Sequence, residues 1–238
     1  MAYRKIVNHI KINEIDSTQD WAKAHYGAFV PNQWTAISAD SQSGGRGQFD
    51  ASWQDVPGSA LLTTWVSPEV SWPANTLWAR QMSVAKLWAE TLRASGYETH
   101  IKWPNDLYIG DRKLAGMLTE ALWRGHSCYR YFVGIGMNVN QAPEGAISLG
   151  PEASVTEWLD RMLVPTAEAI MHPLAETDGY TDLMLGWEQW VRWEMPESGQ
   201  ELVAKPVALD REGRLGVEMK DGGRQWLRPK SWIWKGLV

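Results

Sequence analysis

The 238-residue sequence has a single cysteine and no long apolar run. One cysteine cannot form an intramolecular disulfide, which favours a reducing compartment. No stretch of about 18 uninterrupted apolar residues offers a membrane span, and residues 1–16 lack the apolar segment of about 7–15 residues that a signal peptide needs. We therefore expect a cytoplasmic protein without a membrane partner. Cys128 lies in the apolar run 128–133, which predicts a buried strand residue rather than a nucleophile.

Positive charge is also scarce. The chain has 23 Lys and Arg against 28 Asp and Glu, a formal net charge of -5 and a pI near 5.6. Binding of nucleic acid over a whole surface needs clustered cations, so we expect no DNA partner, although a local basic loop stays compatible with the sequence. No His and Cys cluster has metal-ligand spacing and no Ser-His-Asp arrangement stands out, so a metalloenzyme or a covalent serine enzyme has little support.

The remaining composition suits a packed core. Apolar residues make up 44% and charged residues 21% of the chain, close to the usage of soluble domains. There are 16 tryptophans but only 3 phenylalanines, and we interpret the tryptophans as packing residues. The length fits one large domain, or one domain with a small appendage.

Apolar periodicity predicts an α+β fold with a central mixed or antiparallel sheet. Strands are predicted at residues 10–15, 35–40, 59–66, 100–103, 107–109, 113–123 and 128–140, and in a C-terminal part at 201–209, 215–219 and 225–227. Helices are predicted after residues 16–18, at 75–95, at 155–159 and at 166–193, the last interrupted near Pro173 and Gly179. The change of pattern near Ser198 predicts a main domain, residues 1–197, and a small barrel, residues 198–238, that docks on it.

A polar loop at residues 41–55 is too long for a hairpin turn, and loops of this length are usually functional or mobile. Its segment 41–48 has three glycines, which let the backbone approach a ligand, and Arg46, whose fork of donors can bridge phosphate or carboxylate oxygens. The pattern indicates an anion-binding loop. The alternative is a flexible surface loop with a solvated arginine.

Residues 102–106, Lys-Trp-Pro-Asn-Asp, lie between two predicted strands. A lysine at the end of a strand, held by a proline-containing turn, can place its ammonium against developing negative charge. Asn105 and Asp106 could orient a ligand or a metal-bound water. An ordinary turn is the alternative reading, because proline, asparagine and aspartate all favour turns.

Two further segments carry polar groups. Ser17, Thr18 and Gln19 stand at a helix N-terminus, where they can bind a polar head such as a ureido ring or a carboxylate, or simply cap the helix. Residues 134–140, Gly-Ile-Gly-Met-Asn-Val-Asn, end a strand instead of opening a helix, so they are not a dinucleotide fingerprint. Their glycines leave room beside the sheet for an apolar ligand, with Asn138 facing a polar group.

In combination and in this order, these segments resemble the biotin protein ligase family, in the form that lacks an N-terminal DNA-binding domain. The resemblance runs from about residue 12 to the C-terminus. It rests on residues 16–18, 42–53, 102–107, 112–120 (RKLAGMLTE) and 134–140 (GIGMNVN).

The resemblance implies a mixed sheet flanked by helices, of the kind shared by biotin ligases and class II aminoacyl-tRNA synthetases, and a small C-terminal SH3-like β-barrel. It also implies a two-step ligation, in which biotin and Mg-ATP form biotinyl-5′-adenylate and a lysine of a biotin carboxyl carrier domain then takes the biotinyl group. Mg²⁺ would be held largely by phosphates, with no protein ligand identified.

Residue roles carry over with the motifs. Lys102 and Arg46 are the implied catalytic residues. Biotin would contact Ser17, Thr18, Gln19, Gln42, Gly45, Arg46, Lys102 and Gly116. ATP or the adenylate would contact Arg46, Gly47, Gln48, Trp53, Lys102, Asn105, Lys113 and Asn138.

One departure from the family concerns residues 48–52, which read Gln-Phe-Asp-Ala-Ser where relatives commonly carry further Arg and Gly. Fewer positive charges predict somewhat faster loss of the adenylate. Two other functions stay open: a lipoyl or octanoyl ligase or transferase on the same scaffold, and a non-catalytic biotin sensor. The sequence also leaves the oligomeric state open, a homodimer included.

Overall fold

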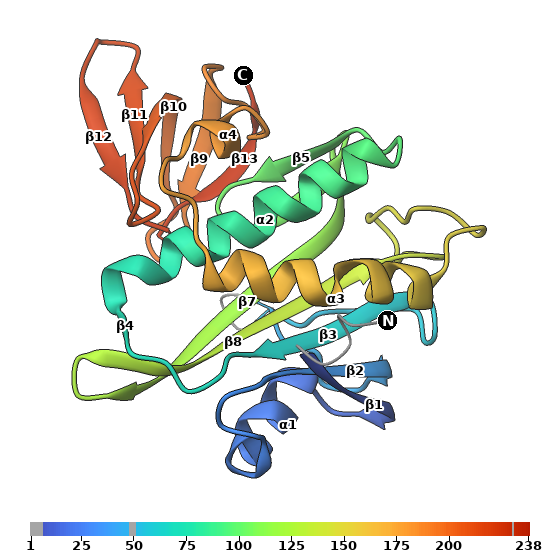
Figure 1. Ribbon diagram of the computed structural model, residues 1–238. Coiled ribbons are helices and arrows are strands. Elements are labelled where there is room, and N and C mark those ends of the chain that lie inside the picture. The colour runs from blue at the N-terminus through green and yellow to red at the C-terminus, as the bar shows by residue number, and fades with distance from the viewer. Residues whose placement is uncertain (1–6, 48–50, 230) are drawn as a thin grey trace.

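The computed structural model describes residues 7–47, 51–229 and 231–238. These residues form a large mixed sheet with helices on both faces and a second, smaller sheet made by the C-terminal part (Figure 1). The predicted α+β class with a central mixed sheet is therefore confirmed. Within the described ranges, no helix is long and apolar enough to cross a membrane.

The large sheet has the strand order β1-β2-β3-β8-β7-β6-β5, with β4 paired to β8. β1 and β2 run parallel, and the other described neighbours run antiparallel. The strands are β1 (Val7–Ile15), β2 (Trp34–Gln42), β3 (Ala60–Val66), β4 (Trp72–Pro73), β5 (Thr99–Lys102), β6 (Asp106–Ile109), β7 (Arg112–Arg124) and β8 (Ser127–Asn138).

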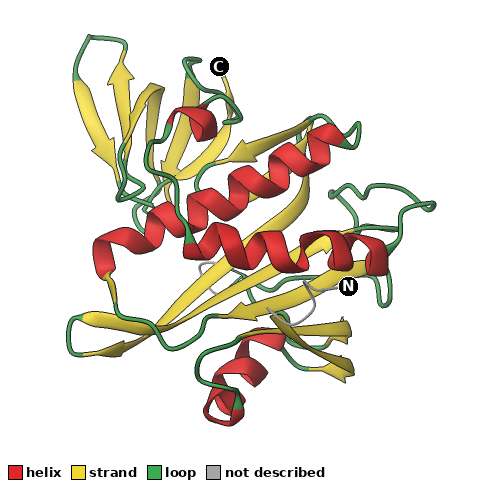
Figure 2. Cartoon of the chain, viewed as in Figure 1, coloured by secondary structure: helices red, strands yellow, loops and turns green. Residues whose placement is uncertain are grey.

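Helices cover the two faces of this sheet unequally (Figure 2). The helices are α1 (Thr18–His25), α2 (Leu77–Ala94), α3 (Val155–Met171) and α4 (Asp178–Thr181), with short 3-10 turns η2 (Tyr26–Ala28) and η3 (Ala74–Thr76). Side chains alternate between the faces of a strand. Trp65 and Val133 join the main core with α2 and α3, whereas their neighbours Val66 and Phe132 pack with Ala22 of α1.

The C-terminal strands form a five-stranded antiparallel sheet in the order β12-β11-β10-β9-β13. They are β9 (Val191–Met195), β10 (Gln200–Leu209), β11 (Leu215–Met219), β12 (Arg224–Leu227) and β13 (Ile233–Leu237). Trp103, in the turn after β5, packs edge-on against Trp193, with ring centroids 6.0 Å apart, and its Nε1 donates to Gly213 O at 3.1 Å. The predicted docking is confirmed. In the described residues no pairing joins β12 to β13, so closure into an SH3-like barrel stays a prediction.

The helix predicted at residues 166–193 is wrong in two respects. α3 is continuous from Val155 to Met171 and accommodates Pro165, although the sequence predicts a break before residue 166. Residues 191–195 form β9 instead of a helix, because Val191 and Trp193 are buried against β10 and β13 while Arg192 stays exposed. The smaller sheet thus begins before the predicted boundary at 198, and the division into two functional domains stays a prediction.

Cys128 lies on β8 and is completely buried, as the sequence predicts. Burial raises the pKa of its thiol to about 11. A protonated, enclosed thiol is a poor nucleophile.

Candidate functional site

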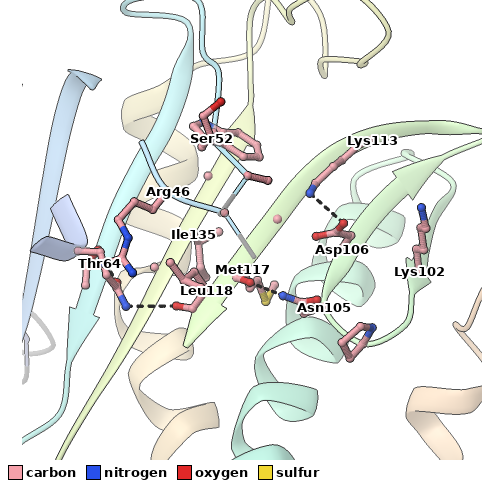
Figure 3. A pocket seen from close by; sticks show the side chains of 18 of the residues that line it. Arg46, Ser52, Thr64, Lys102, Asn105, Asp106, Lys113, Met117, Leu118 and Ile135 are labelled. Carbon is pink, nitrogen blue, oxygen red and sulfur yellow. Dashed lines mark hydrogen bonds and ion pairs between the residues drawn. The ribbon is translucent and has the colours of Figure 1, made fainter. Parts of the chain in front are cut away.

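A pocket of about 260 Å³ opens on the face of the large sheet that carries α1 (Figure 3). Its walls come from α1, the loop after β2, strands β3, β7 and β8, the turn between β5 and β6, and β13. Arg46 and Lys102 lie on opposite sides of it in Figure 3. The residues predicted for the site that line this pocket are Ser17, Thr18, Gln19, Gln42, Arg46, Gly47, Trp53, Lys102, Asn105, Lys113 and Gly116.

The polar end of the pocket is built on the start of α1. Ser17 caps the helix by accepting a hydrogen bond from the Asp20 amide at 3.3 Å. The Thr18 amide donates to Gln42 Oε1 at 2.7 Å, and the Thr64 hydroxyl donates to Thr18 Oγ1 at 2.9 Å. Helix capping and pocket lining, which the sequence presents as alternatives, are therefore both present.

Gln19 also lines this polar end. Its side chain is buried, and Oε1 accepts from Thr64 Oγ1 at 3.1 Å while Nε2 donates to Leu118 O at 3.4 Å. A Cβ on Gly134 would lie 2.7 Å from Gln19 Oε1. The glycine on β8 thus makes room for the glutamine amide.

The loop after β2 folds back on itself as a narrow arm. The Trp53 amide donates to Gly45 O at 2.8 Å and the Gly47 amide donates to Ala51 O at 2.6 Å. These bonds place the backbones of Arg46 and Ser52 opposite each other in an antiparallel bridge. The arm lays the Trp53 ring over the β8 glycine Gly136, where a Cβ would approach the ring to 2.5 Å. The described part of the loop is a hydrogen-bonded wall of the pocket.

Arg46 forms ion pairs with two carboxylates and is not simply solvated. Its guanidinium lies 2.5 Å from Asp20 Oδ1 and 3.4 Å from Glu120, and Lys23 contacts both carboxylates. Burial opposes the positive charge, but Glu120 and Asp20 outweigh it and raise the pKa of Arg46. The reading of Arg46 as a merely solvated residue is wrong.

Lys102 ends β5 with its ammonium partly enclosed. Nζ donates to the Tyr108 hydroxyl at 3.3 Å and lies 5.0 Å from the Tyr108 ring centre and 5.2 Å from that of Trp234. Burial lowers its pKa and two neighbouring lysines add to this effect, while Asp106 opposes it. A partly desolvated ammonium interacts more strongly with an anion than an exposed one does.

The turn that follows Lys102 is anchored from three directions. Tyr180 donates its hydroxyl to Pro104 O at 2.7 Å, and Asn105 donates its side-chain amide to Met117 O. Asp106 pairs with Lys113 at 2.8 Å. The segment is a turn and a pocket wall at once.

Among the described residues, two predicted site residues, Gly45 and Asn138, do not line the pocket. Gly45 supports the arm through its carbonyl and lies so close to Trp53 O that a Cβ would stand 2.8 Å away. Asn138 is buried and donates to Ile147 O at 3.2 Å. Gln48 lies outside the described residues.

Other lining residues were not predicted. Thr64 and Leu118 are the cross-strand partners of Gly134, so the strand register could have indicated them. The wall formed by residues 232–234 comes from the C-terminal sheet, and nothing in the sequence signals that it returns to Lys102. Among the described residues, no group of three or more His, Cys, Asp or Glu side chains is placed to hold a metal ion.

The pocket on the mixed sheet combines a hydroxyl and amide recess, a tryptophan wall and three cationic side chains, Arg46, Lys102 and Lys113. This combination suits an elongated small molecule with a polar head and an anionic centre. Residues 12–138 match the Biotin/lipoate A/B protein ligase family, and the chain therefore belongs to that family.

Individual relatives are similar over most of the chain. The bifunctional ligase/repressor BirA of Bacillus subtilis is 30% identical over 214 residues, which are 79% of this chain but only 62% of that protein. The biotin–[acetyl-CoA-carboxylase] ligase of Mycobacterium tuberculosis is 29% identical over 223 residues, 85% of this chain and 79% of that protein.

Solved structures share the fold. The biotin protein ligase of Aquifex aeolicus in complex with biotin and ATP superposes with a TM-score of 0.72 at 24% identity, covering 96% of this chain and 98% of that one. The biotin acetyl coenzyme A carboxylase synthetase of Helicobacter pylori gives a TM-score of 0.64 at 22% identity, covering 92% and 99%. At this identity the likeness establishes the architecture.

Proposed function

We propose that this chain ligates biotin, at the expense of ATP, to a lysine of a biotin carboxyl carrier domain. The observation that carries the proposal is the pocket itself, in which a polar recess, Arg46 and Lys102 face one cavity. Family membership and the names of the relatives support the same activity, and the name of the M. tuberculosis relative supports a carboxylase as the source of the acceptor.

Biotin enters with its ureido head in the recess at the start of α1. Ser17, Thr18 and Gln42 offer hydroxyl and amide groups there, and buried polar groups of this kind discriminate strongly against heads that leave them unpaired. The tail then runs past Gly116 and along the Trp53 side chain towards the cations.

In the first step a carboxylate oxygen of biotin attacks the α-phosphorus of ATP. The bond from that phosphorus to the bridging oxygen breaks, and pyrophosphate leaves. Lys102 contacts both the carboxylate and the α-phosphate while negative charge redistributes between them, and Arg46 holds the phosphate of the adenylate. Fixed donors aimed at developing charge are worth several kcal/mol of barrier.

In the second step the neutral ε-amine of the acceptor lysine attacks the acyl carbon of the adenylate. The bond to the phosphate oxygen breaks, AMP leaves with the electron pair, and the amine loses a proton to water. An amide between biotin and the carrier results.

Mg²⁺ fits this site as a companion of the phosphates. Asp106 is the carboxylate that lines the pocket, and it pairs with Lys113 at 2.8 Å, which leaves the described wall poor in oxygen ligands. Mg²⁺ commonly keeps several waters and uses one or two carboxylates besides phosphate oxygens. Bound in that way it would neutralise phosphate charge. The cytoplasmic location stays a prediction.

The test is biotin-dependent release of pyrophosphate from ATP, followed by mass measurement of an apo biotin carrier domain. We expect Lys102→Ala to lower pyrophosphate release by roughly 10²–10³-fold or more. Lys11→Ala is the matched control, because Lys11 forms a surface pair with Asp40 at 3.0 Å and does not line the pocket.

The same assay separates the alternatives. Turnover with lipoate in place of biotin would identify a lipoyl ligase. Tight biotin binding by the wild type without pyrophosphate release would identify a sensor, and either result would overturn the proposal.

A further inference from the structure

Arg46 belongs to a cluster of four charged side chains beside the pocket. Asp20 and Lys23 come from α1, Glu120 from β7 and Arg46 from the arm after β2. Arg46 Nη1 lies 2.5 Å from Asp20 Oδ1, and both terminal nitrogens lie 3.4 Å from Glu120 oxygens. Lys23 Nζ lies 3.1 Å from Asp20 and 2.9 Å from Glu120.

The cluster is electrically neutral, because two cations meet two carboxylates. A phosphate that approaches Arg46 therefore meets a guanidinium whose charge is already compensated. An end-on bidentate phosphate contact uses the two terminal nitrogens, and both of these nitrogens already contact the two carboxylates.

Asp20 and Arg46 stand on different sides of the pocket wall. Arg46 lines the cavity, whereas Asp20 is not a lining residue and its side chain is 50% exposed. Hydrogen bonds from Lys23 and Arg46 outweigh the burial of Asp20 and lower its pKa, so the carboxylate is charged at neutral pH. The guanidinium of a lining residue is therefore paired with a carboxylate that does not itself line the cavity.

We propose that Asp20 is a positioning residue that competes with the adenylate phosphate for Arg46 and thereby sets how fast the acyl-adenylate leaves the pocket. The inference rests on the proposed function. In this inference a carboxylate that is present, Asp20, opposes retention of the adenylate. The prediction from residues 48–52 is a separate one, because it concerns positive charges that this chain lacks.

The expected effect is moderate because the pair is partly exposed. Partly exposed ion pairs change equilibria by small factors, so Asp20→Asn should slow adenylate dissociation by about two- to five-fold. Asp20→Glu retains the charge and should return the rate towards the wild-type value. Biotin KM in the pyrophosphate assay should stay within about two-fold, because the recess at Ser17 and Gln42 is not part of the cluster.

The experiment uses the full chain loaded with biotin, ATP and pyrophosphatase, so that labelled adenylate accumulates on the protein. Its release is followed after a chase with excess unlabelled biotin and ATP. Asp40→Asn is the matched control, since it removes a surface carboxylate that pairs with Lys11 outside the pocket. Asp20→Ser provides a second neutral variant, and thermal unfolding checks that each variant is folded.

Slower release in both neutral variants, with recovery in Asp20→Glu and no change in Asp40→Asn, supports the competition. Unchanged or faster release in the neutral variants overturns it, because Asp20 would then be irrelevant or would orient Arg46 towards the ligand. Slow release that persists in Asp20→Glu also overturns it. If the wild type forms no adenylate, the proposed function fails together with the inference, whereas adenylate of unchanged lifetime in Asp20→Asn removes the inference alone.

Discussion

Gly136 on β8 lies directly beneath the Trp53 ring, and replacing it by alanine tests how closely the arm packs on the sheet. A Cβ there would lie 2.5, 2.7 and 2.8 Å from three ring carbons, well inside the ordinary contact distance of 3.4–4 Å. The ring is rigid, so it has to retreat by about 1 Å. Overpacking of this kind costs about 1–3 kcal/mol of unfolding free energy. At roughly 2–4 °C per kcal/mol for a chain of this size, Tm should fall by about 2–12 °C.

Thermal unfolding followed by circular dichroism measures this change, with Gly27→Ala as the matched control. Gly27 lies in η2, has no atom within 4 Å of the position that a Cβ would take and has no left-handed backbone, so Tm should change little or rise slightly. A double-mutant cycle with Trp53→Ala is decisive. Once the ring is gone, Gly136→Ala should cost less than about 0.5 kcal/mol. An undiminished cost in the Trp53→Ala background would refute the steric argument, as would an unchanged Tm in the single variant.

Two further predictions concern the core. Trp103→Phe leaves the Gly213 carbonyl without its 3.1 Å donor at the junction of the two sheets, so the free energy of unfolding, measured in urea, should fall by about 1–3 kcal/mol. In the control Trp123→Phe, at a side chain that is 47% exposed, the free energy of unfolding should change by less than about 0.5 kcal/mol. Burial raises the pKa of Cys128 from 9.0 to about 11. The contribution of the buried thiol to the free energy of unfolding is therefore complete below pH 9 and is lost as the pH rises towards 11, because the thiol of the unfolded chain ionises first. The wild type should therefore lose about 2–3 kcal/mol more than Cys128→Ala over that interval, and parallel pH profiles of the two proteins would contradict this assignment.

Local patterns predicted the elements that depend on near neighbours. The N-cap at Ser17, the long helix α2 and the strands of the large sheet follow from capping chemistry and from periods of 3.6 and 2 residues. The continuation of α3 through Pro165 was not predictable in the same way, because packing of the helix on α2 offsets the loss of one backbone donor.

β9 shows why local signals fail near the domain junction. Residues 191–195 have an apolar spacing that a helix also tolerates, and only pairing with β10 and β13 selects the strand. Asn138 shows the same limit in the site, since its residue type suits a ligand contact but the fold commits its amide to Ile147 O.

The sequence by itself determined the family, most of the large sheet and 11 of the 25 residues that line the pocket, because the motifs stand at strand ends and at a helix start, where short-range geometry already aims them. Only the tertiary structure decided which charges meet. Arg46 contacts Asp20 and Glu120 across 26 and 74 residues of chain, and Trp234 returns from β13 to cover Lys102. Contacts of this kind depend on sheet register and domain docking, which are cooperative properties of the whole fold that no local pattern encodes.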